Sequence, residues 1–420
     1  MRARTLTAFV LAAALTAVPP AAVAGVRAVA IVGSEGVTSP AAPAALNRYA
    51  ARRWPAWHLP PGRLTPHGAV LATLFGAYYR SYYARAGLLP PSGCADASFV
   101  YVRADLRPAS QATAAALLSG LAPQCDLTVA ASAAPPDPAF DPLPALGKAD
   151  PAQSAAAVTA AAGGDLTAIP ATYRPALARL DGLLGCSGID CTRIATLPSR
   201  VVIDGATGLA SLHGPVDTAA AAVDELLLEY AGALPGESVG WGRLDLDTLG
   251  GLLQLRVLRQ LVEDRNPYAA RLTASSLAAA VTATLDQSVS GRRDAQTPAP
   301  PASRFVAFIG PETNLARLAG LLQLAWVVPG AQPDATLPGS ALVFELHDAD
   351  RRAGENAPFV QAFFVAQPLL AMRRASAGSG ALAVMRLPLR IPGCPDVRCP
   401  LRTFDSVVRA AVDPSFVARF

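Results

Sequence analysis

The sequence predicts an α/β core that is interrupted by a helical cap, and three observations support this fold class. Short apolar runs, which are typical of buried strands, occur at residues 27–32, 99–102, 305–309, 341–346 and 359–365. Segments of helical composition follow the first two runs, and a long helical stretch separates these runs from the last three. Strand–helix units on both sides of a helical insertion indicate an α/β domain that carries a second, helical unit.

Local sequence patterns predict the helices and loops in the first third of the chain. The first apolar run ends at Gly33, and a loop rich in glycine, serine and proline extends to Pro43. Thr65 is suited to cap a helix over residues 65–86, because Pro66 stands at the first helical position. A second helix is expected over residues 110–121, and a connection rich in proline, aspartate and alanine follows at 135–151.

The middle of the chain is expected to be helical throughout. From residue 152 to about 268 the pattern is interrupted only by a small loop between Cys186 and Cys191. Residues 288–303 have the composition of an exposed linker. We therefore expect residues 25–150 and 269–420 to form the α/β core, and residues 151–268 to form a helical cap domain.

Composition excludes several classes of protein. The chain has 420 residues, of which 52% are hydrophobic and 16% charged, so it is not expected to be disordered. Beyond the N-terminus no long apolar run is free of charge or proline, which disfavours a polytopic membrane protein. The formal net charge is +4 and the basic residues are scattered, so no nucleic-acid partner is expected.

Residues 1–24 have the pattern of a secretory signal peptide. Arg2 and Arg4 precede an apolar segment at 6–18, and Ala22-Val23-Ala24 forms a cleavage site. An uncleaved membrane anchor is the alternative, which the short apolar segment and the prolines after it disfavour. The sequence predicts a periplasmic or secreted protein that is free of the membrane after cleavage; the oligomeric state is left open.

The cysteines are even in number and fall into three neighbouring pairs. In an oxidising compartment, disulfides are the expected state of such pairs. A zinc site is the alternative for the two C-x4-C pairs, which the absence of a histidine near either of them disfavours. No cofactor is expected. The predicted disulfides are Cys94–Cys125, Cys186–Cys191 and Cys394–Cys399.

Several segments together resemble one known family. They are LNRYAARRWPAWHLPPGRLTPHGAVLATLFGAYYR (46–80), GLAPQC (120–125), LLLEYAGALP with VGWGR (226–243), RNPYAAR (265–271), FVAFIGPETNLARLAGLLQL (305–324), LPGSALVFEL (337–346) and FFVAQPLLAMR (363–373). The chain resembles the histidine acid phosphatases, in the branch of periplasmic phytases and glucose-1-phosphatases. The resemblance implies a histidine-phosphatase-like α/β/α core with a central mixed sheet, plus a helical cap domain.

The resemblance also implies where catalytic residues would stand. The family has an RHGxRxP motif with a nucleophilic histidine, a further arginine that binds phosphate, and an HD pair whose aspartate protonates the leaving group. This sequence carries other residues at each of these positions. They are Ser34, Glu35 and Thr38 in the first motif, Ala109 at the next arginine, and Pro311 and Glu312 at the HD pair.

These replacements lead to three hypotheses. The first is a catalytically inactive member, a pseudoenzyme that acts by binding a small phosphorylated or sugar-like ligand. The second is an active acid phosphomonoesterase, similar to a phytase or glucose-1-phosphatase, that uses Glu35 and Glu312 with arginines from elsewhere. The third is a metal or sugar site lined by carboxylates. Whether Arg103 or Arg107 reaches this site is left open.

The remaining candidate residues are interpreted as structural rather than catalytic. His67 is assigned to the turn that opens a helix, and His347-Asp348 to a surface loop rather than to a catalytic HD pair. The aromatic residues between positions 54 and 83 are expected to pack in the core. The chain lacks a G-x-S-x-G elbow, an H-E-x-x-H pair and a phosphate-binding P-loop, so it carries no motif of those enzymes.

Overall fold

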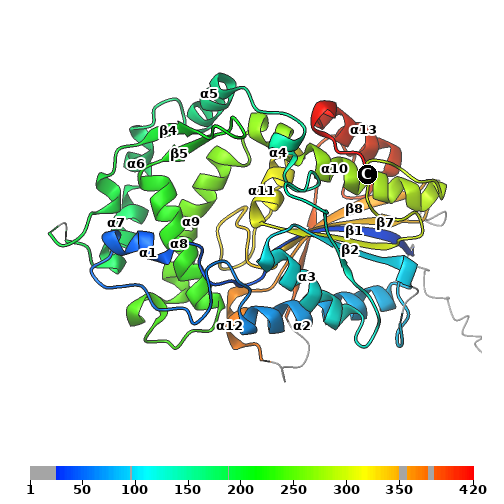
Figure 1. The fold of residues 1–420 in the computed structure, drawn as a ribbon, viewed down its shortest axis with the longest axis horizontal. Helices are drawn as coiled ribbons and strands as arrows, with labels where there is room; N and C mark the ends of the chain where they lie inside the picture. Colours follow the sequence, from blue (N-terminus) through cyan, green and yellow to red (C-terminus); the bar gives the residue numbers. More distant parts are fainter. Residues whose placement is uncertain (1–24, 95–96, 188, 350–356, 377–382) are drawn as a thin grey trace, which may run out of the picture.

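A computed structural model describes residues 25–94, 97–187, 189–349, 357–376 and 383–420. It consists of a β-sheet with helices on both faces and a group of helices beyond one end of the strands (Figure 1). The predicted signal peptide at 1–24 lies outside the described residues. No helix of the described residues is long and apolar enough to cross a membrane.

The sheet is mixed, as the resemblance implies. Its strand order is β10-β8-β7-β1-β6-β2-β3, with β9 also paired to β8. The central strand β1 (Val26–Ser34) runs parallel to β6 (Phe305–Gly310) and antiparallel to β7 (Ala341–His347). Strands β1 and β6 are buried almost throughout, because helices cover both faces, and so they appear in the sequence as continuous apolar runs.

The five predicted strands are present in this sheet, and three short strands of the same sheet were missed. The outer predicted strands are β2 (Val100–Ala104) and β8 (Phe359–Ala366). The missed strands are β3 (Val129–Ala130), β9 (Met385–Leu389) and β10 (Cys399–Pro400). Two of them have only two residues, and β9 contains proline and arginine, so none shows a clear strand pattern.

Helices α2 (Pro66–Arg85) and α3 (Pro108–Leu121) cover one face of the sheet. Thr65 caps α2 as predicted, since its side chain accepts a hydrogen bond from the backbone N–H of Gly68 at 2.8 Å. The two helices approach closely at glycines: a Cβ at Gly76 would lie 2.0 Å from the carbonyl oxygen of Leu117.

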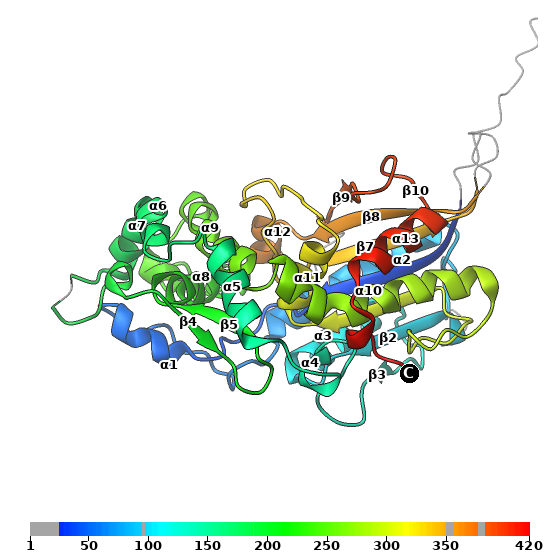
Figure 2. The ribbon, with the colours of Figure 1, turned by 90° about the horizontal axis from the view of Figure 1, so that it is seen from above.

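The other face is covered by α10 (Pro267–Ser290), α11 (Glu312–Leu321) and α13 (Leu401–Ala411), as the view from above in Figure 2 shows. The predicted linker therefore begins later than expected, because α10 extends to Ser290. The short helix α12 (Leu369–Arg374) lies near α8.

A group of helices lies beyond the end of the sheet (Figures 1 and 2). It contains α5 (Pro151–Ala161), α6 (Ala168–Thr172), α7 (Arg174–Leu184), α8 (Pro215–Ala231) and α9 (Leu246–Glu263). We call it the helical group. The expectation that this stretch is helical throughout was wrong, because β4 (Arg200–Ile203) and β5 (Ala210–His213) form an antiparallel hairpin within it. Three β-branched residues in β4, followed by a turn, favour this structure.

Two further short helices lie outside this stretch. Helix α1 (Pro43–Leu46) packs on α8, although it comes from the segment assigned to the core. Helix α4 (Pro142–Ala145) contacts α10.

All three predicted disulfides are present. They join Cys94 to Cys125, Cys186 to Cys191 and Cys394 to Cys399. No cysteine among the described residues is free.

The interpretation of His347 as part of a surface loop was wrong. His347 is the last residue of β7 and only 7% exposed, and its ring stacks on Phe359 at 5.0 Å. Its Nε2 lies 3.2 Å from the buried carboxylate of Glu345. The aromatic prediction is confirmed in α2, where Tyr79 and Tyr83 are fully buried.

Candidate functional site

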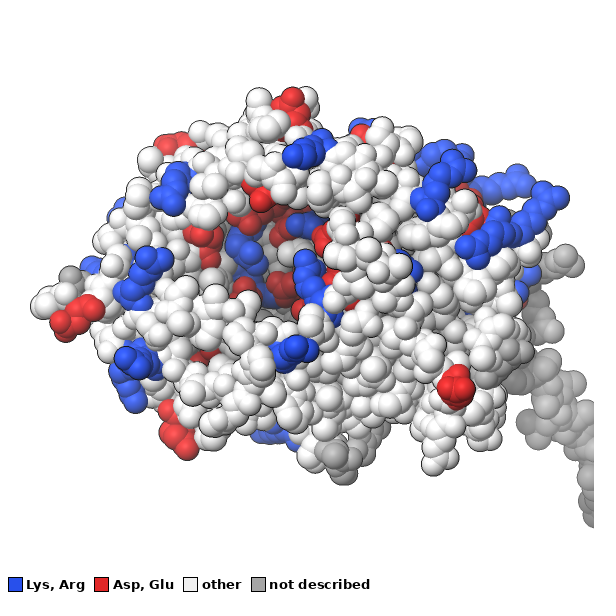
Figure 3. Space-filling view, viewed as in Figure 1, with Lys and Arg blue, Asp and Glu red and all other residues white. Residues whose placement is uncertain are grey.

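A hollow opens between the sheet and the helical group, and acidic and basic side chains gather in it (Figure 3). Its volume is about 240 Å³. The strands β1 and β6 run parallel and both end here, so the residues that follow them meet at one edge of the sheet. The lining residues are Glu35, Gly36, Thr38, Ser39, Pro40, Ala41, Gly62, Asp224, Leu227, Leu228, Arg256, Glu312 and Pro338.

Glu35 is the first residue after β1, and both its backbone N–H and its backbone carbonyl oxygen form hydrogen bonds. Its N–H donates to the carbonyl oxygen of Gly310 at 2.9 Å, and its carbonyl oxygen accepts from Gly339 at 2.7 Å. Its carboxylate accepts a hydrogen bond from the hydroxyl of Ser110 at 2.7 Å. Burial raises the pKa of Glu35, while the Ser110 hydrogen bond and the charge of Arg107 oppose this increase.

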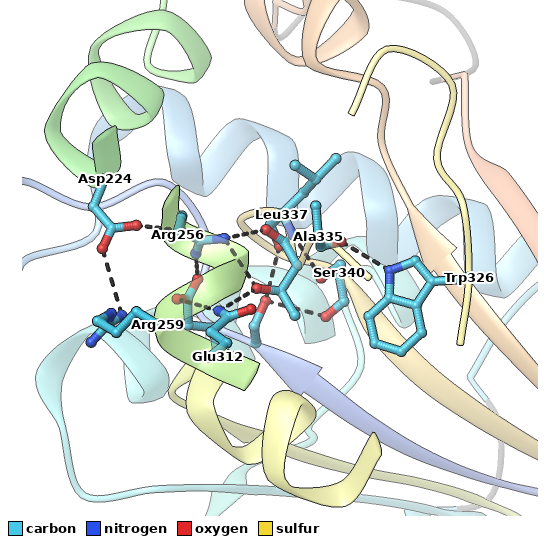
Figure 4. Close-up of polar contacts among 11 residues, drawn as sticks. Asp224, Arg256, Arg259, Glu312, Trp326, Ala335, Leu337 and Ser340 are labelled. Carbon is cyan, nitrogen blue, oxygen red and sulfur yellow. Dashed lines mark hydrogen bonds and ion pairs between the residues drawn. The ribbon is translucent and has the colours of Figure 1, made fainter. Parts of the chain in front are cut away.

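Glu312 begins α11 and also lines the hollow. Its carboxylate forms an ion pair with Arg256 and accepts a hydrogen bond from the side-chain amide of Gln260 at 3.1 Å. Figure 4 shows Glu312, Arg256 and Asp224 in one network. A carboxylate in the first turn is also favoured by the helix dipole.

Arg256 is the central cation of this network and only 2% exposed. It forms ion pairs with Glu312 and with Asp224, and it donates to the carbonyl oxygen of Thr336 at 2.5 Å and to its hydroxyl at 3.1 Å. Asp224 also lies 3.8 Å from Arg259. The network therefore connects α8, α9 and α11.

Sequence reasoning missed Arg256, Asp224 and Gln260. The available signal was a charged residue within the apolar run of α9, where Leu255 and Val257 flank Arg256 and all three are buried. A buried arginine in such a run requires acidic partners, but the sequence does not indicate which ones.

The structure brings only some of the predicted site residues together. Glu35, Thr38 and Glu312 line the hollow, whereas Ser34, Ala109 and Pro311 are not among its lining residues. The hydroxyl of Ser34 donates to the carbonyl oxygens of Ser340 at 3.2 Å and of Leu337 at 3.3 Å. Ala109 is 1% exposed in the first turn of α3, and Pro311 is the N-cap of α11.

The question about Arg103 and Arg107 has a clear answer. Arg103 is buried and paired with Asp137 at 2.9 Å, so its guanidinium is held away from the hollow. Arg107 lies close enough for its charge to lower the pKa of Glu35, but it is shared between Asp105 at 3.8 Å and Asp141 at 3.6 Å.

Metal ligands are not clustered in the described part of the chain. There, no group of three or more histidine, cysteine, aspartate or glutamate residues is arranged to hold a metal ion. In the hollow itself, two of the three lining carboxylates, those of Asp224 and Glu312, are paired with Arg256.

The sheet order, the helices on both faces and the hollow beyond β1 and β6 define a histidine-phosphatase fold. The solved structure of the Hafnia alvei phytase in complex with tartrate has the same fold, with a TM-score of 0.85 and 30% identity, and the match covers 94% of this chain and 98% of that one. The same phytase in complex with myo-inositol hexakis sulphate matches with a TM-score of 0.84.

Sequence comparison leads to the same conclusion. Phytase AppA of Escherichia coli is 30% identical over 409 residues, which cover 93% of this chain and 92% of that protein. The glucose-1-phosphatase of Salmonella typhimurium is 27% identical over 372 residues, or 85% of each chain. No model of a protein family matches the sequence. The chain belongs to the histidine acid phosphatase family.

Proposed function

We propose that this chain does not hydrolyse phosphomonoesters and that it binds a small ligand in the hollow. The fold of a family and the chemistry of its site are separable, so the scaffold can persist after catalysis is lost. Glu35 stands where the family motif has its nucleophilic histidine, and Ser34, Thr38 and Ala109 stand where it has arginines. Loss of a nucleophile that acts together with its partners reduces turnover by about 10⁶-fold.

One observation carries the proposal: the guanidinium that lines the hollow is already occupied. Arg256 is paired with Glu312 and Asp224 and also donates to Thr336, so its positive charge is balanced by groups of the protein itself. A phosphomonoester dianion would meet the carboxylate of Glu35 instead. At 4 Å, two like unit charges repel by about 4 kcal/mol at an effective dielectric constant of 20.

The active-enzyme hypothesis requires Glu35 as nucleophile and Glu312 as proton donor. The contacts of Glu312 oppose this role, because its carboxylate is already engaged by Arg256 and by the side-chain amide of Gln260. The hydrogen bond from Ser110 likewise stabilises the ionised form of Glu35, although burial raises the pKa of Glu35. Among the described residues that line the hollow, the one cation is Arg256, which is paired with two carboxylates, so a nucleophile here lacks the main source of transition-state stabilisation.

The test is hydrolysis of 4-nitrophenyl phosphate and of myo-inositol hexakisphosphate from acid to neutral pH, with Phytase AppA as the positive control. We expect no turnover above the buffer rate. Turnover that Glu35→Gln or Glu312→Gln abolishes would establish the carboxylate-based phosphomonoesterase instead. A melting temperature that rises with a divalent cation, and no longer does so in Glu35→Ala, would favour the metal site.

The cellular location is part of the proposal. Three disulfides in the described residues are typical of a protein from an oxidising compartment, which supports a periplasmic or secreted location. N-terminal sequencing of the exported protein should give Gly25 as the first residue. Recovery of the full-length chain in the membrane fraction would identify an uncleaved anchor instead.

A further inference from the structure

Two glutamates of α8 are buried without a cation. Glu225 is 2% exposed, and Glu229, one turn further along the helix, is fully buried. Neither forms an ion pair with a residue of the described ranges, and neither lines the hollow. One carboxyl oxygen of Glu229 has no hydrogen-bond partner among the described residues. Burying an ionised carboxylate in this way is costly, so this environment favours the protonated, neutral form of both side chains.

The segment at residues 41–62, which is blue in Figure 1, packs on α8 next to these glutamates. We call it the strap. The indole N–H of its Trp57 donates to the carboxyl group of Glu225 at 3.0 Å. Its Trp54 packs against Trp241, with the ring centroids 4.8 Å apart. The underside of the strap and the buried glutamates therefore share one interface.

The ends of the strap belong to the wall of the hollow. Ala41 and Gly62 both line it, together with the preceding Ser39. The N–H of Gly62 donates to the carbonyl oxygen of Ser39 at 3.1 Å, so the two ends of the strap lie together. A movement of the strap would therefore shift this wall.

Between its ends, the strap is attached to its surroundings by only a small number of backbone contacts in the described structure. The N–H of Ala51 donates to the carbonyl oxygen of Leu184 at 3.0 Å, and the carbonyl oxygen of Arg48 accepts from Thr192 at 2.8 Å. The backbone from residue 51 to 62 is irregular. Segments of this kind open locally at a lower free energy than the strands of a core.

The charges that act on the two glutamates are acidic. Burial raises the pKa of Glu225 to about 7; the hydrogen bond from Trp57 opposes this increase, and the charge of Asp224 adds to it. Burial likewise raises the pKa of Glu229 to about 8; the N–H of Gly240 opposes this increase, and the charge of Glu225 adds to it. Ionisation of one glutamate therefore makes ionisation of the other less favourable.

The cations on the elements around α8 do not neutralise this pair, because they have other partners or are exposed. Arg256 and Arg259 pair with Asp224, Arg193 pairs with Asp181, His213 lies 3.9 Å from Asp217, and Arg373 donates to the carbonyl oxygens of Tyr230 and Leu234. In the strap and beside Trp241, the exposed charged or titratable side chains are Arg48, Arg52, Arg53, His58, Glu237 and Arg243.

We propose that the strap is a pH-sensitive cover of α8, which stays closed while Glu225 and Glu229 are protonated and opens locally when they ionise. In the closed state an ionised pair would lie one turn apart and away from water, whereas in the open state water would solvate both carboxylates. Because the ends of the strap line the hollow, opening changes access to the hollow. The inference is independent of what the hollow does with its ligand.

The direction of the pH dependence follows from proton binding. The closed state holds both protons more tightly than the open state, in which the carboxyl groups have their ordinary pKa near 4.5. The equilibrium constant for opening is therefore smallest below pH 4.5, rises with pH, and becomes constant once the pH has passed 7 and 8. From about pH 6 to about pH 8, solvation of Glu225 alone raises this constant about tenfold.

Hydrogen exchange followed by mass spectrometry tests the inference, at pH 6 and pH 8 and corrected for intrinsic exchange rates. We expect peptides of the strap to be less protected than those of β6 at both pH values, and their protection factors to fall at least about tenfold between them. In the double variant Glu225→Gln with Glu229→Gln, whose amide oxygens can accept the same hydrogen bonds, strap protection should be equal at the two pH values. Glu237→Gln, at an exposed position, should follow the wild type.

Two results on the wild type alone would overturn the inference. Strap protection equal to that of β6 would show that the strap opens only when the whole protein unfolds, and strap protection that does not change between pH 6 and pH 8 would remove the pH dependence. An equal fall in the folded double variant would assign that dependence to other groups and would overturn the inference as well. None of these results bears on phosphomonoester hydrolysis, so the proposed function is tested separately.

Discussion

Arg256 in α9 and Glu312 at the start of α11 form an ion pair in the lining of the hollow, and so join the helical group to the sheet core. Asp224 of α8 contacts the same guanidinium. A buried cation with two carboxylate partners is stable only while both remain, since removal of one charge leaves the others desolvated and unpaired. The pair therefore lines the site and also connects the helical group to the sheet core.

Replacement of Arg256 should destabilise the protein strongly. Arg256→Ala is expected to lower the free energy of unfolding by about 3–5 kcal/mol, because it leaves Glu312 and Asp224 without their cation. Urea unfolding followed by tryptophan fluorescence measures this change. Arg179→Ala, at an exposed position of α7, is the matched control and should change it by less than about 1 kcal/mol. Equal losses in the two variants would show that the network contributes nothing beyond a surface arginine.

Two acids buried in α8 should make the protein less stable at alkaline pH. Burial raises the pKa of Glu229 to about 8 and that of Glu225 to about 7. The folded state holds these protons more tightly than the unfolded state, so their contribution is complete below the ordinary pKa near 4.5 and is lost as the pH rises through 7 and 8.

Melting temperatures between about pH 5 and pH 9 test this pH dependence. Glu229 accepts a hydrogen bond from the backbone of Gly240 at 2.8 Å, which a glutamine can also accept. Glu229→Gln should therefore melt like the wild type at the acid end and a few degrees higher at the alkaline end. Glu237→Gln, which is exposed, should follow the wild type throughout. A pH profile of Glu229→Gln that parallels the wild type would refute the assignment.

A glycine in the first turn of α2 holds the loop that carries Glu35. A Cβ at Gly68 would lie 2.2 Å from the carbonyl oxygen of Val37, which is closer than atoms can approach. Gly68→Ala should lower stability by about 1–3 kcal/mol and weaken ligand binding, because the loop must move. Gly182→Ala in α7 meets no atom within 4 Å and should instead stabilise its helix by about 0.5–1 kcal/mol. Loss of stability in Gly182→Ala equal to that in Gly68→Ala would rule out the steric explanation.

The disulfides should differ in importance according to the length of chain that they close. Cys94 and Cys125 are 31 residues apart, and Cys186 and Cys191 are 5 apart. By the loop-length relation, removal of the first pair should cost about 1.5 kcal/mol more than removal of the second. Urea midpoints of the two double alanine variants measure the difference, and equal midpoints would contradict the entropic account.

Local patterns were sufficient for much of the fold. The central strands are covered on both faces and therefore appear as apolar runs, and Thr65-Pro66 marks the start of α2 because capping depends on neighbouring residues. The three cysteine pairs were predicted from spacing and compartment. That Glu35 and Glu312 line one hollow is consistent with their positions after two strands that run parallel.

The sequence by itself determined the α/β class, the ends of the central strands and the two acids that follow them, because these depend on short-range patterns. Only the tertiary structure decided that the helical group contains a hairpin, that His347 is buried against Glu345, and that Arg256 takes its partners from α8 and α11. Such partners are distant in sequence, so which charges remain free in the hollow emerges only when the chain is folded.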